Sequence, residues 1–308
     1  MEWVAPDTAA TPPPVRPPVD SLVVLPGASR VPVRRLGPQT TADILDGAFA
    51  VIKRAPATII GLTAIFVIPA QLLATWMANK GSSGLDPLAV FSGDTSYLTP
   101  DNDANPAGTL WIYAAVIPST IALVFVAAGI ARLISAWQVG GDLTLGEILR
   151  GLWPRTWAIL ASAFVIKLIE GIGFLFCTLP ALAFMTLCLV TVPAIASEQL
   201  GPMTGIRRSW RLVQRRFWPV MAIGILVGLV STLFSNALQA LPLLFSAFTG
   251  GDQVSWPIVG ALSSLSALLT VPMVGAASML TYLDLRVRTE GLDLELEAID
   301  LLPTTTAA

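Results

Sequence analysis

Six stretches of the chain are long and apolar enough to cross a lipid bilayer, and they constrain the fold more than any other feature. A helix that rises 1.5 Å per residue needs about 20 mostly apolar residues to cross about 30 Å of hydrocarbon. The stretches that meet this length are residues 56–78, 109–137, 156–178, 180–197, 217–241 and 256–283. Thr178, Leu179 and Pro180 predict a tight turn that joins the third and fourth into a hairpin. We therefore expect an all-α membrane protein with six transmembrane helices.

The composition agrees with a chain whose main solvent is lipid. Of the 308 residues, 54% are apolar and 12% are charged, against about 25% charged in soluble domains. The sequence has no histidine, which excludes a catalytic His base and His-ligated zinc or haem. It also shows no metal-ligand cluster, phosphate-binding loop or nucleic-acid motif. We expect no cofactor, no metal and no nucleic-acid partner.

The basic residues predict how the six helices are oriented. Most of the 18 Lys and Arg residues lie before the first span, near the second connection, in the fourth connection and after the last span. With six crossings, these four regions fall on the same side of the membrane. The positive-inside rule places that side, and both chain termini, in the cytoplasm. Residues 79–108 then form the one sizeable loop on the opposite side.

The chain divides into a membrane domain and two tails. Residues 1–38 contain nine prolines and no apolar run after a basic start, which predicts a disordered cytoplasmic tail rather than a cleaved signal peptide. This tail is either a ligand for a partner domain or a spacer, and composition alone favours the spacer. Residues 39–290 form the six-span domain, and residues 291–308 form a cytoplasmic C-terminal tail.

A short pattern recurs before the first, third and fifth spans. Three segments align on an isoleucine, at Ile44, Ile148 and Ile206. Three residues later, each has a small residue, at Gly47, Gly151 and Ser209. The predicted unit is an amphipathic helix at the cytoplasmic interface followed by a transmembrane hairpin, used three times. Internal repeats are common in transporters, but they also arise by plain duplication, so the pattern predicts an architecture and not an activity.

In the second copy, Thr144 and Glu147 have the spacing of a capping box. In such a box the side chains of the N-cap residue and of the residue three places later each bind a free backbone amide. We expect a helix to begin here.

Two stretches resemble a known family. The first comprises Arg35-Leu-Gly, Ile44-Leu-Asp-Gly-Ala-Phe and Lys53-Arg-Ala-Pro, and the second runs over residues 281–295. Together they resemble bacterial, largely actinobacterial, glycerophosphoryl diester phosphodiesterase membrane-domain proteins, over residues 35–297. The resemblance implies an integral protein of the bacterial plasma membrane. A catalytic domain of that class resembles a His-using, metal-dependent barrel of about 250 residues, for which this chain has neither the histidines nor the length outside its spans.

Lys167 and Glu170 are the ionisable residues in the middle of the third span. Being three residues apart, they share one face of the helix. An ionisable residue at this depth is by default a functional hypothesis, here a relay for protons or substrate. The alternative is an ion pair that neutralises itself and fixes the helix against its neighbours. We favour the ion pair, because both signs are present and no further acidic chain follows.

Four arginines of the third amphipathic segment form a candidate contact for anionic lipid headgroups. They are Arg207, Arg208, Arg211 and Arg215. Each charge near an anionic membrane surface contributes roughly 1 kcal/mol of attraction before screening. Ordinary positive-inside bias explains the same arginines without a ligand, and the two interpretations stand equal.

Two further features predict packing or docking. Gly224 and Gly228 form a Gly-x-x-x-Gly motif in the fifth span, for which we expect internal helix packing rather than dimerisation. A collar of charges follows the last span, at Asp284, Arg286, Arg288 and Glu290. It is either a docking surface or an anchor with local salt bridges, and we favour the anchor for the arginines.

The sequence favours a non-catalytic membrane scaffold or partner-binding module. The alternative is a transporter or permease component with Lys167 and Glu170 in a polar path. A membrane enzyme ranks third, because no nucleophile, base or paired-carboxylate arrangement is visible. The expected partners are the bilayer, with anionic lipids as one hypothesis, and a membrane or soluble protein.

Overall fold

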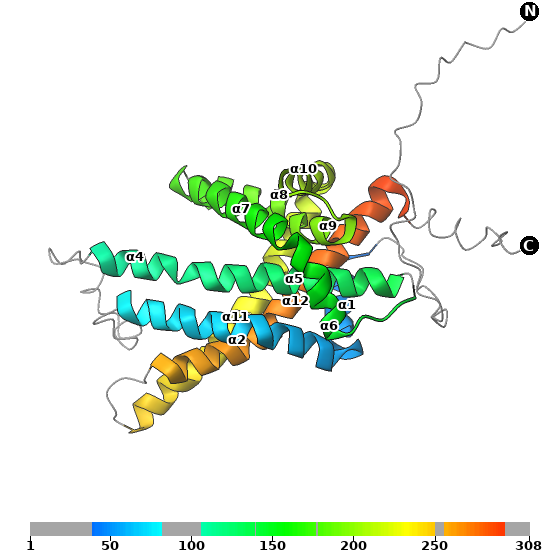
Figure 1. Ribbon diagram of the computed structural model, residues 1–308. Helices are drawn as coiled ribbons and strands as arrows, with labels where there is room; N and C mark the ends of the chain where they lie inside the picture. The colour runs from blue at the N-terminus through cyan, green and yellow to red at the C-terminus, as the bar shows by residue number, and fades with distance from the viewer. Residues whose placement is uncertain (1–38, 82–105, 139, 177, 250–255, 293–308) are drawn as a thin grey trace, which may run out of the picture.

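The computed structural model describes residues 39–81, 106–138, 140–176, 178–249 and 256–292 (Figure 1). Within these ranges the chain forms helices and short connections, and no strand. The expected N-terminal tail and nearly all of the C-terminal tail lie outside the described residues, as does most of the 79–108 loop.

Among the described residues, six helical segments are long and apolar enough to cross a membrane. They are Pro56–Lys80, Val116–Gln138, Leu145–Gly173, Leu179–Glu198, Pro202–Leu238 and Gly260–Glu290. This confirms the predicted fold class, an all-α membrane protein with six transmembrane helices.

Helix α12 (Trp256–Glu290) is the centre of the bundle. It contacts α1 (Thr41–Arg54), α2 (Pro56–Gly81), α5 (Val116–Gln138) and α11 (Phe217–Thr249). Figure 1 shows α2 and α5 running side by side, with α11 and α12 crossing them. Residues 275–283 of α12 are all buried. This part of the helix therefore has neighbours on every side, whereas a helix at the lipid boundary has neighbours on one side only.

Glycine allows α12 to approach α5 closely. A Cβ atom on Gly275 would lie 3.1 Å from the Cα of Ala127, which is backbone and cannot rotate away. The glycines of the predicted packing motif behave differently. A Cβ on Gly224 would meet only Leu189, at 3.8 Å, and one on Gly228 would meet nothing within 4 Å. Neither glycine is required for a close helix contact, because Gly224 leaves room for a Cβ beside Leu189 and Gly228 has no described neighbour, so the predicted packing role of this motif is not borne out among the described residues.

Helices α7 (Thr156–Phe176) and α8 (Thr178–Cys188) form the predicted hairpin. They approach so closely that a Cβ on Gly173 would lie 2.9 Å from the Cα of Ala181. The predicted turn at Thr178–Pro180 is misplaced, since these residues are the first turn of α8. Proline is tolerated there because the first backbone amides of a helix have no partner within it.

Two of the predicted spans are interrupted four residues before a proline. The second divides into α4 (Pro106–Ala114) and α5, ahead of Pro118, and the fourth into α8 and α9 (Thr191–Glu198), ahead of Pro193. A proline in a helix clashes with the carbonyl four residues earlier and leaves it unbonded. The helices break at those carbonyls, whereas Pro69 and Pro272 lie inside continuous helices.

Three short helices precede spanning helices: α1, α6 (Leu145–Leu152) and α10 (Pro202–Val213). The 3₁₀ turns η3 (Trp153–Arg155) and η4 (Gln214–Arg216) connect α6 to α7 and α10 to α11. We call the part of the molecule that holds these three helices and the last turns of α12 the basic end (Figure 1). It corresponds to the side predicted to be cytoplasmic.

The positions that align in the sequence also face inward in the structure. Ile44, Ile148 and Ile206 are buried. The small residues that follow them lie at close contacts, with Gly47 against Leu280, Gly151 against the guanidinium of Arg132, and the Ser209 hydroxyl donating to the Leu187 carbonyl at 2.6 Å. The capping box of Thr144 and Glu147 is present, and Thr40 and Asp43 form another at α1. The threefold repeat itself stays a prediction.

Candidate functional site

Glu198, the last residue of α9, is the centre of a polar cluster at the basic end. Its Oε1 accepts a hydrogen bond from the hydroxyl of Tyr282, which is fully buried in α12. The same oxygen accepts from the guanidinium of Arg208 in α10, at 2.8 Å from Nη2 and 3.2 Å from Nε. Three helices are joined through a single carboxylate oxygen.

Arg208 extends this cluster to the end of α12. Its Nη2 donates to Oε2 of Glu290 at 2.7 Å, and its Nη1 donates to Oε1 of the same carboxylate. Arg286 donates to Glu290 at 3.2 Å and lies 3.8 Å from Glu198. Two arginines and two glutamates balance in charge, and the planar guanidinium of Arg208 matches the carboxylate with two parallel bonds. We call these four residues, together with Tyr282, the Glu198 cluster.

A second set of contacts ties the start of α1 to α12. The backbone amide of Gln39 donates to Asp284 at 2.8 Å, and the Gln39 carbonyl accepts from Arg288 at 2.9 Å. Arg288 also donates to both oxygens of Asp284, at 2.8 and 2.9 Å. The predicted charged collar therefore contains the expected local salt bridges and, in addition, contacts to segments far away in the sequence.

The structure separates the four arginines that the sequence grouped as headgroup contacts. Arg208 lies in the Glu198 cluster, with 22% of its side chain exposed. Arg207, Arg211 and Arg215 are exposed and four residues apart, so they share one face of α10 and η4. Within the described part of the chain, none of the three forms an ion pair. We call these three residues the arginine ridge.

Lys167 and Glu170 form an ion pair of 2.7 Å within α7. The Lys167 side chain is 47% exposed and that of Glu170 is 11% exposed. Lys167 thus lies on the outside of the described bundle and Glu170 faces inward. The ion pair exists, and a role in proton or substrate transfer stays a prediction.

A cavity of about 460 Å³ lies in the half of the bundle opposite the basic end, between α2, α5, α11 and α12. Its polar lining comprises Gln71, Thr75, Ser119, Ser235, Ser263, Ser266 and Thr270. A smaller cavity, of about 180 Å³, lies at the basic end beside Gln39 and Asp284. Neither of these two cavities is lined by Lys167 or Glu170.

Sequence reasoning missed both Glu198 and the large cavity. Glu198 ends an apolar span, and its partners Arg208 and Tyr282 lie 10 and 84 residues away. The one local signal for it is that a carboxylate stands at the boundary of a span. The serines and threonines of the cavity are spread over four helices, and no local pattern connects them. Within the described residues, no group of three or more Cys, Asp or Glu side chains is placed to hold a metal ion.

No protein-family model, curated protein or solved structure matches this chain. The resemblance to phosphodiesterase membrane-domain proteins remains a prediction.

Proposed function

We propose that this chain is a non-catalytic membrane scaffold that binds an acidic segment of a partner protein through the arginine ridge. The observation that carries the proposal is that the arginines of α10 fall into two groups, one paired with glutamates and one exposed. Arg208 holds the helix through the Glu198 cluster, while Arg207, Arg211 and Arg215 remain exposed and unpaired among the described residues.

A ridge of this kind is suited to binding because its backbone is already ordered. Association costs less when the binding surface does not have to be fixed first. Guanidinium groups pair with carboxylates through two parallel bonds. The ridge therefore offers three free guanidinium groups on an ordered helix, held by the Glu198 cluster, to a partner with carboxylates at matching spacing.

The non-catalytic part of the proposal rests on the side chains available and not on the fold. The sequence has no histidine, and the acidic and phenolic groups of the Glu198 cluster already share hydrogen bonds with arginines or with each other. A carboxylate bonded to two guanidinium groups is a poor general base, because its negative charge is stabilised.

Purification in mild detergent with variants of the ridge tests the proposal. The triple variant Arg207→Glu, Arg211→Glu, Arg215→Glu reverses the ridge, and Arg150→Glu, at an exposed arginine of α6, is the matched control. We expect the wild type and Arg150→Glu to retain the same partner proteins and the triple variant to lose them. Equal recovery from all three proteins would contradict the proposal, as would recovery that depends only on anionic lipid.

A second candidate function is that of a transporter component, and the large cavity favours it. A space lined by hydroxyl groups among apolar helices is a usual feature of a solute path. The alternative derived from the sequence put Lys167 and Glu170 in such a path, but the two residues do not line this cavity. Uptake by proteoliposomes, compared between wild type and a variant with a filled cavity, Ser266→Leu, would test it.

A further inference from the structure

We infer that the cavity between α2, α5, α11 and α12 is a binding site for a neutral, hydroxyl-rich group such as a sugar. The inference goes beyond the proposed scaffold and does not depend on it, since the arginine ridge lies at the opposite end of the bundle. The volume of about 460 Å³ lies within the range of small-molecule sites, roughly 300–1,000 Å³.

The cavity extends from the middle of the span toward the rim opposite the basic end. Gln71 is 15 residues beyond Pro56 and 10 residues before Gly81, the two ends of α2, and Ala78, also in the lining, is three residues before Gly81. Polar groups at this depth have no water to bind unless a cavity admits it, and an unpaired amide in hydrocarbon costs several kcal/mol. The cavity gives the side chains that line it access to water or to a polar ligand.

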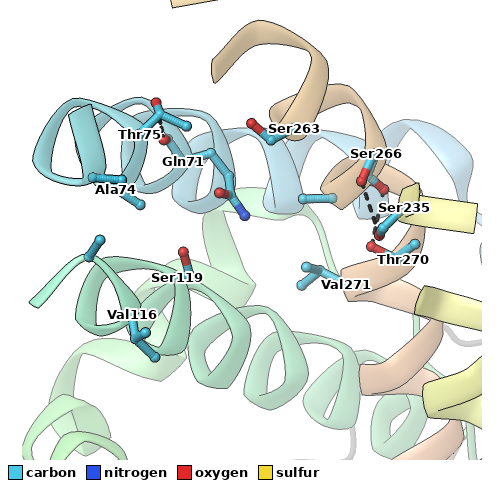
Figure 2. Close-up of a pocket in the computed structure, with 13 residues that line it drawn as sticks. Gln71, Ala74, Thr75, Val116, Ser119, Ser235, Ser263, Ser266, Thr270 and Val271 are labelled. Atoms are coloured by element: carbon cyan, nitrogen blue, oxygen red, sulfur yellow. Dashed lines mark hydrogen bonds between the residues drawn. The ribbon is translucent and has the colours of Figure 1, made fainter. Parts of the chain in front are cut away.

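Two of the lining groups lack a partner within the described chain. The side-chain amide of Gln71 and the hydroxyl of Ser119 form no hydrogen bond with the described residues. Figure 2 shows both directed into the space between α2 and α5. An amide offers two donors and an acceptor, and a hydroxyl offers one donor and an acceptor.

The other hydroxyls present mainly lone pairs to the cavity. Thr75 donates to the carbonyl of Gln71 at 2.8 Å, and Thr270 donates to the carbonyl of Ser266 at 3.1 Å. Ser266 donates to the hydroxyl of Ser235 at 3.1 Å, as the dashed line in Figure 2 marks. Because these protons are already used, the walls are rich in acceptors, and a complementary ligand must bring several donors.

The lining also favours a neutral ligand. None of the described residues that line the cavity carries a charge, and a charge buried without a counter-charge is strongly unfavourable. A group with many hydroxyls and no charge satisfies both conditions. The remaining walls, which include Ala74, Val116 and Val271, suit the apolar faces of a sugar ring or the first carbons of a lipid.

Such a group could come from a free sugar or from the headgroup of a neutral glycolipid, and one experiment separates these sources. The full chain is purified in a mild non-glycosidic detergent and studied by native mass spectrometry. The probes are monoglucosyl diacylglycerol, diacylglycerol, phosphatidylglycerol, phosphatidylethanolamine and free glucose. We expect a saturable one-to-one adduct with monoglucosyl diacylglycerol that diacylglycerol does not form. Competition by free glucose would assign the site to a free solute, and its absence would assign the site to the lipid.

Variants with a matched control show where the adduct forms. Thr270→Val and Gln71→Leu should each weaken binding about tenfold, as expected for the loss of one or two hydrogen bonds. Thr281→Val is the control, because Thr281 lies in the same helix and makes the same bond to the carbonyl four residues earlier but does not line the cavity. If Gln71→Leu does not fold, Ser119→Ala takes its place.

Three results would overturn the inference. The first is that phosphatidylglycerol or phosphatidylethanolamine binds as tightly as the glucolipid, and the second is that no probe binds above its non-specific level. The third is that Thr270→Val and Thr281→Val have the same affinity as the wild type. None of these results bears on the arginine ridge, so failure here is distinguishable from failure of the proposed scaffold.

Discussion

The basic end and the opposite half of the bundle use polar side chains in contrasting ways. At the basic end, charged side chains pair with one another in the Glu198 cluster, where Glu198, Arg208, Arg286 and Glu290 are bonded together. In the opposite half the described groups that line the cavity are hydroxyls and one amide, without charge.

The contrast shows that polar residues among apolar helices can either fix the positions of the helices or form a binding site. A charged cluster fixes the relative positions of α9, α10 and α12, because each arginine must keep its carboxylates. Hydroxyls can satisfy their protons on the carbonyls of their own helix, so they need no neighbouring helix and leave lone pairs facing a cavity. We therefore expect substitutions in the Glu198 cluster to change stability, and those around the cavity to change binding.

The largest effect is expected where α12, which runs through both regions, crosses α5. Gly275→Leu places a side chain against the Ala127 backbone and should lower the free energy of unfolding by about 3 kcal/mol. Gly228→Leu adds the same side chain where nothing lies within 4 Å and should change it little. Unfolding in a denaturing detergent measures both, and equal losses would mean that α12 is not the central helix.

Next in size is the loss of the Glu198 cluster. Arg208→Gln should cost about 2 kcal/mol, because Glu198 and Glu290 lose charge-assisted hydrogen bonds. Arg211→Gln, in the same helix but exposed, should cost less than about 0.5 kcal/mol. Hydrogen exchange should show faster opening of α10 in the first variant alone. Similar hydrogen exchange in both variants would contradict the conclusion that the Glu198 cluster fixes the position of α10.

A smaller effect is expected where α1 joins α12. Asp284→Asn keeps an acceptor for the Gln39 amide but loses the charge that holds Arg288, so it should cost about 1 kcal/mol. Its signature is local, with faster hydrogen exchange in the first turn of α1 and unchanged exchange in α10. Faster exchange in α10 would show that the two sets of contacts at the basic end act as one.

The smallest effect is expected for the pair of Lys167 and Glu170, which belongs to neither region. Lys167 is 47% exposed, and pairs of this kind contribute about 1 kcal/mol or less. Lys167→Met alone leaves Glu170 without its partner, so we expect the double variant with Glu170→Gln to be closer to the wild type in stability. If the double variant is normally expressed and stable but loses partner binding or uptake, the pair is a functional relay.

Much of the architecture follows from local sequence alone. The length of each apolar stretch determines whether a helix can cross the membrane, and the six predicted spans correspond to six such helices. The capping box at Thr144 and Glu147 and the pairing of Lys167 with Glu170 follow in the same way. In each case the interacting groups lie within one helical turn, so helical geometry suffices.

The breaks within helices were only partly predictable. Pro118 and Pro193 interrupt their spans, but Pro69 and Pro272 do not. A proline always removes one hydrogen bond. Whether the helix breaks or continues depends on what packs around the freed carbonyl, and that lies on other helices.

What the tertiary structure alone decided is which face of each helix meets which neighbour. Close backbone contacts of glycine proved to be at Gly173 and Gly275 and not at Gly224 or Gly228. Arg208 was set apart from its exposed neighbours by its bond to Glu290, 82 residues away. The serines and threonines of the cavity likewise converge from four helices. The periodicity of a sequence indicates that a helix has an apolar and a polar face. What each face contacts depends on how distant segments pack, because those contacts join residues that no local pattern relates.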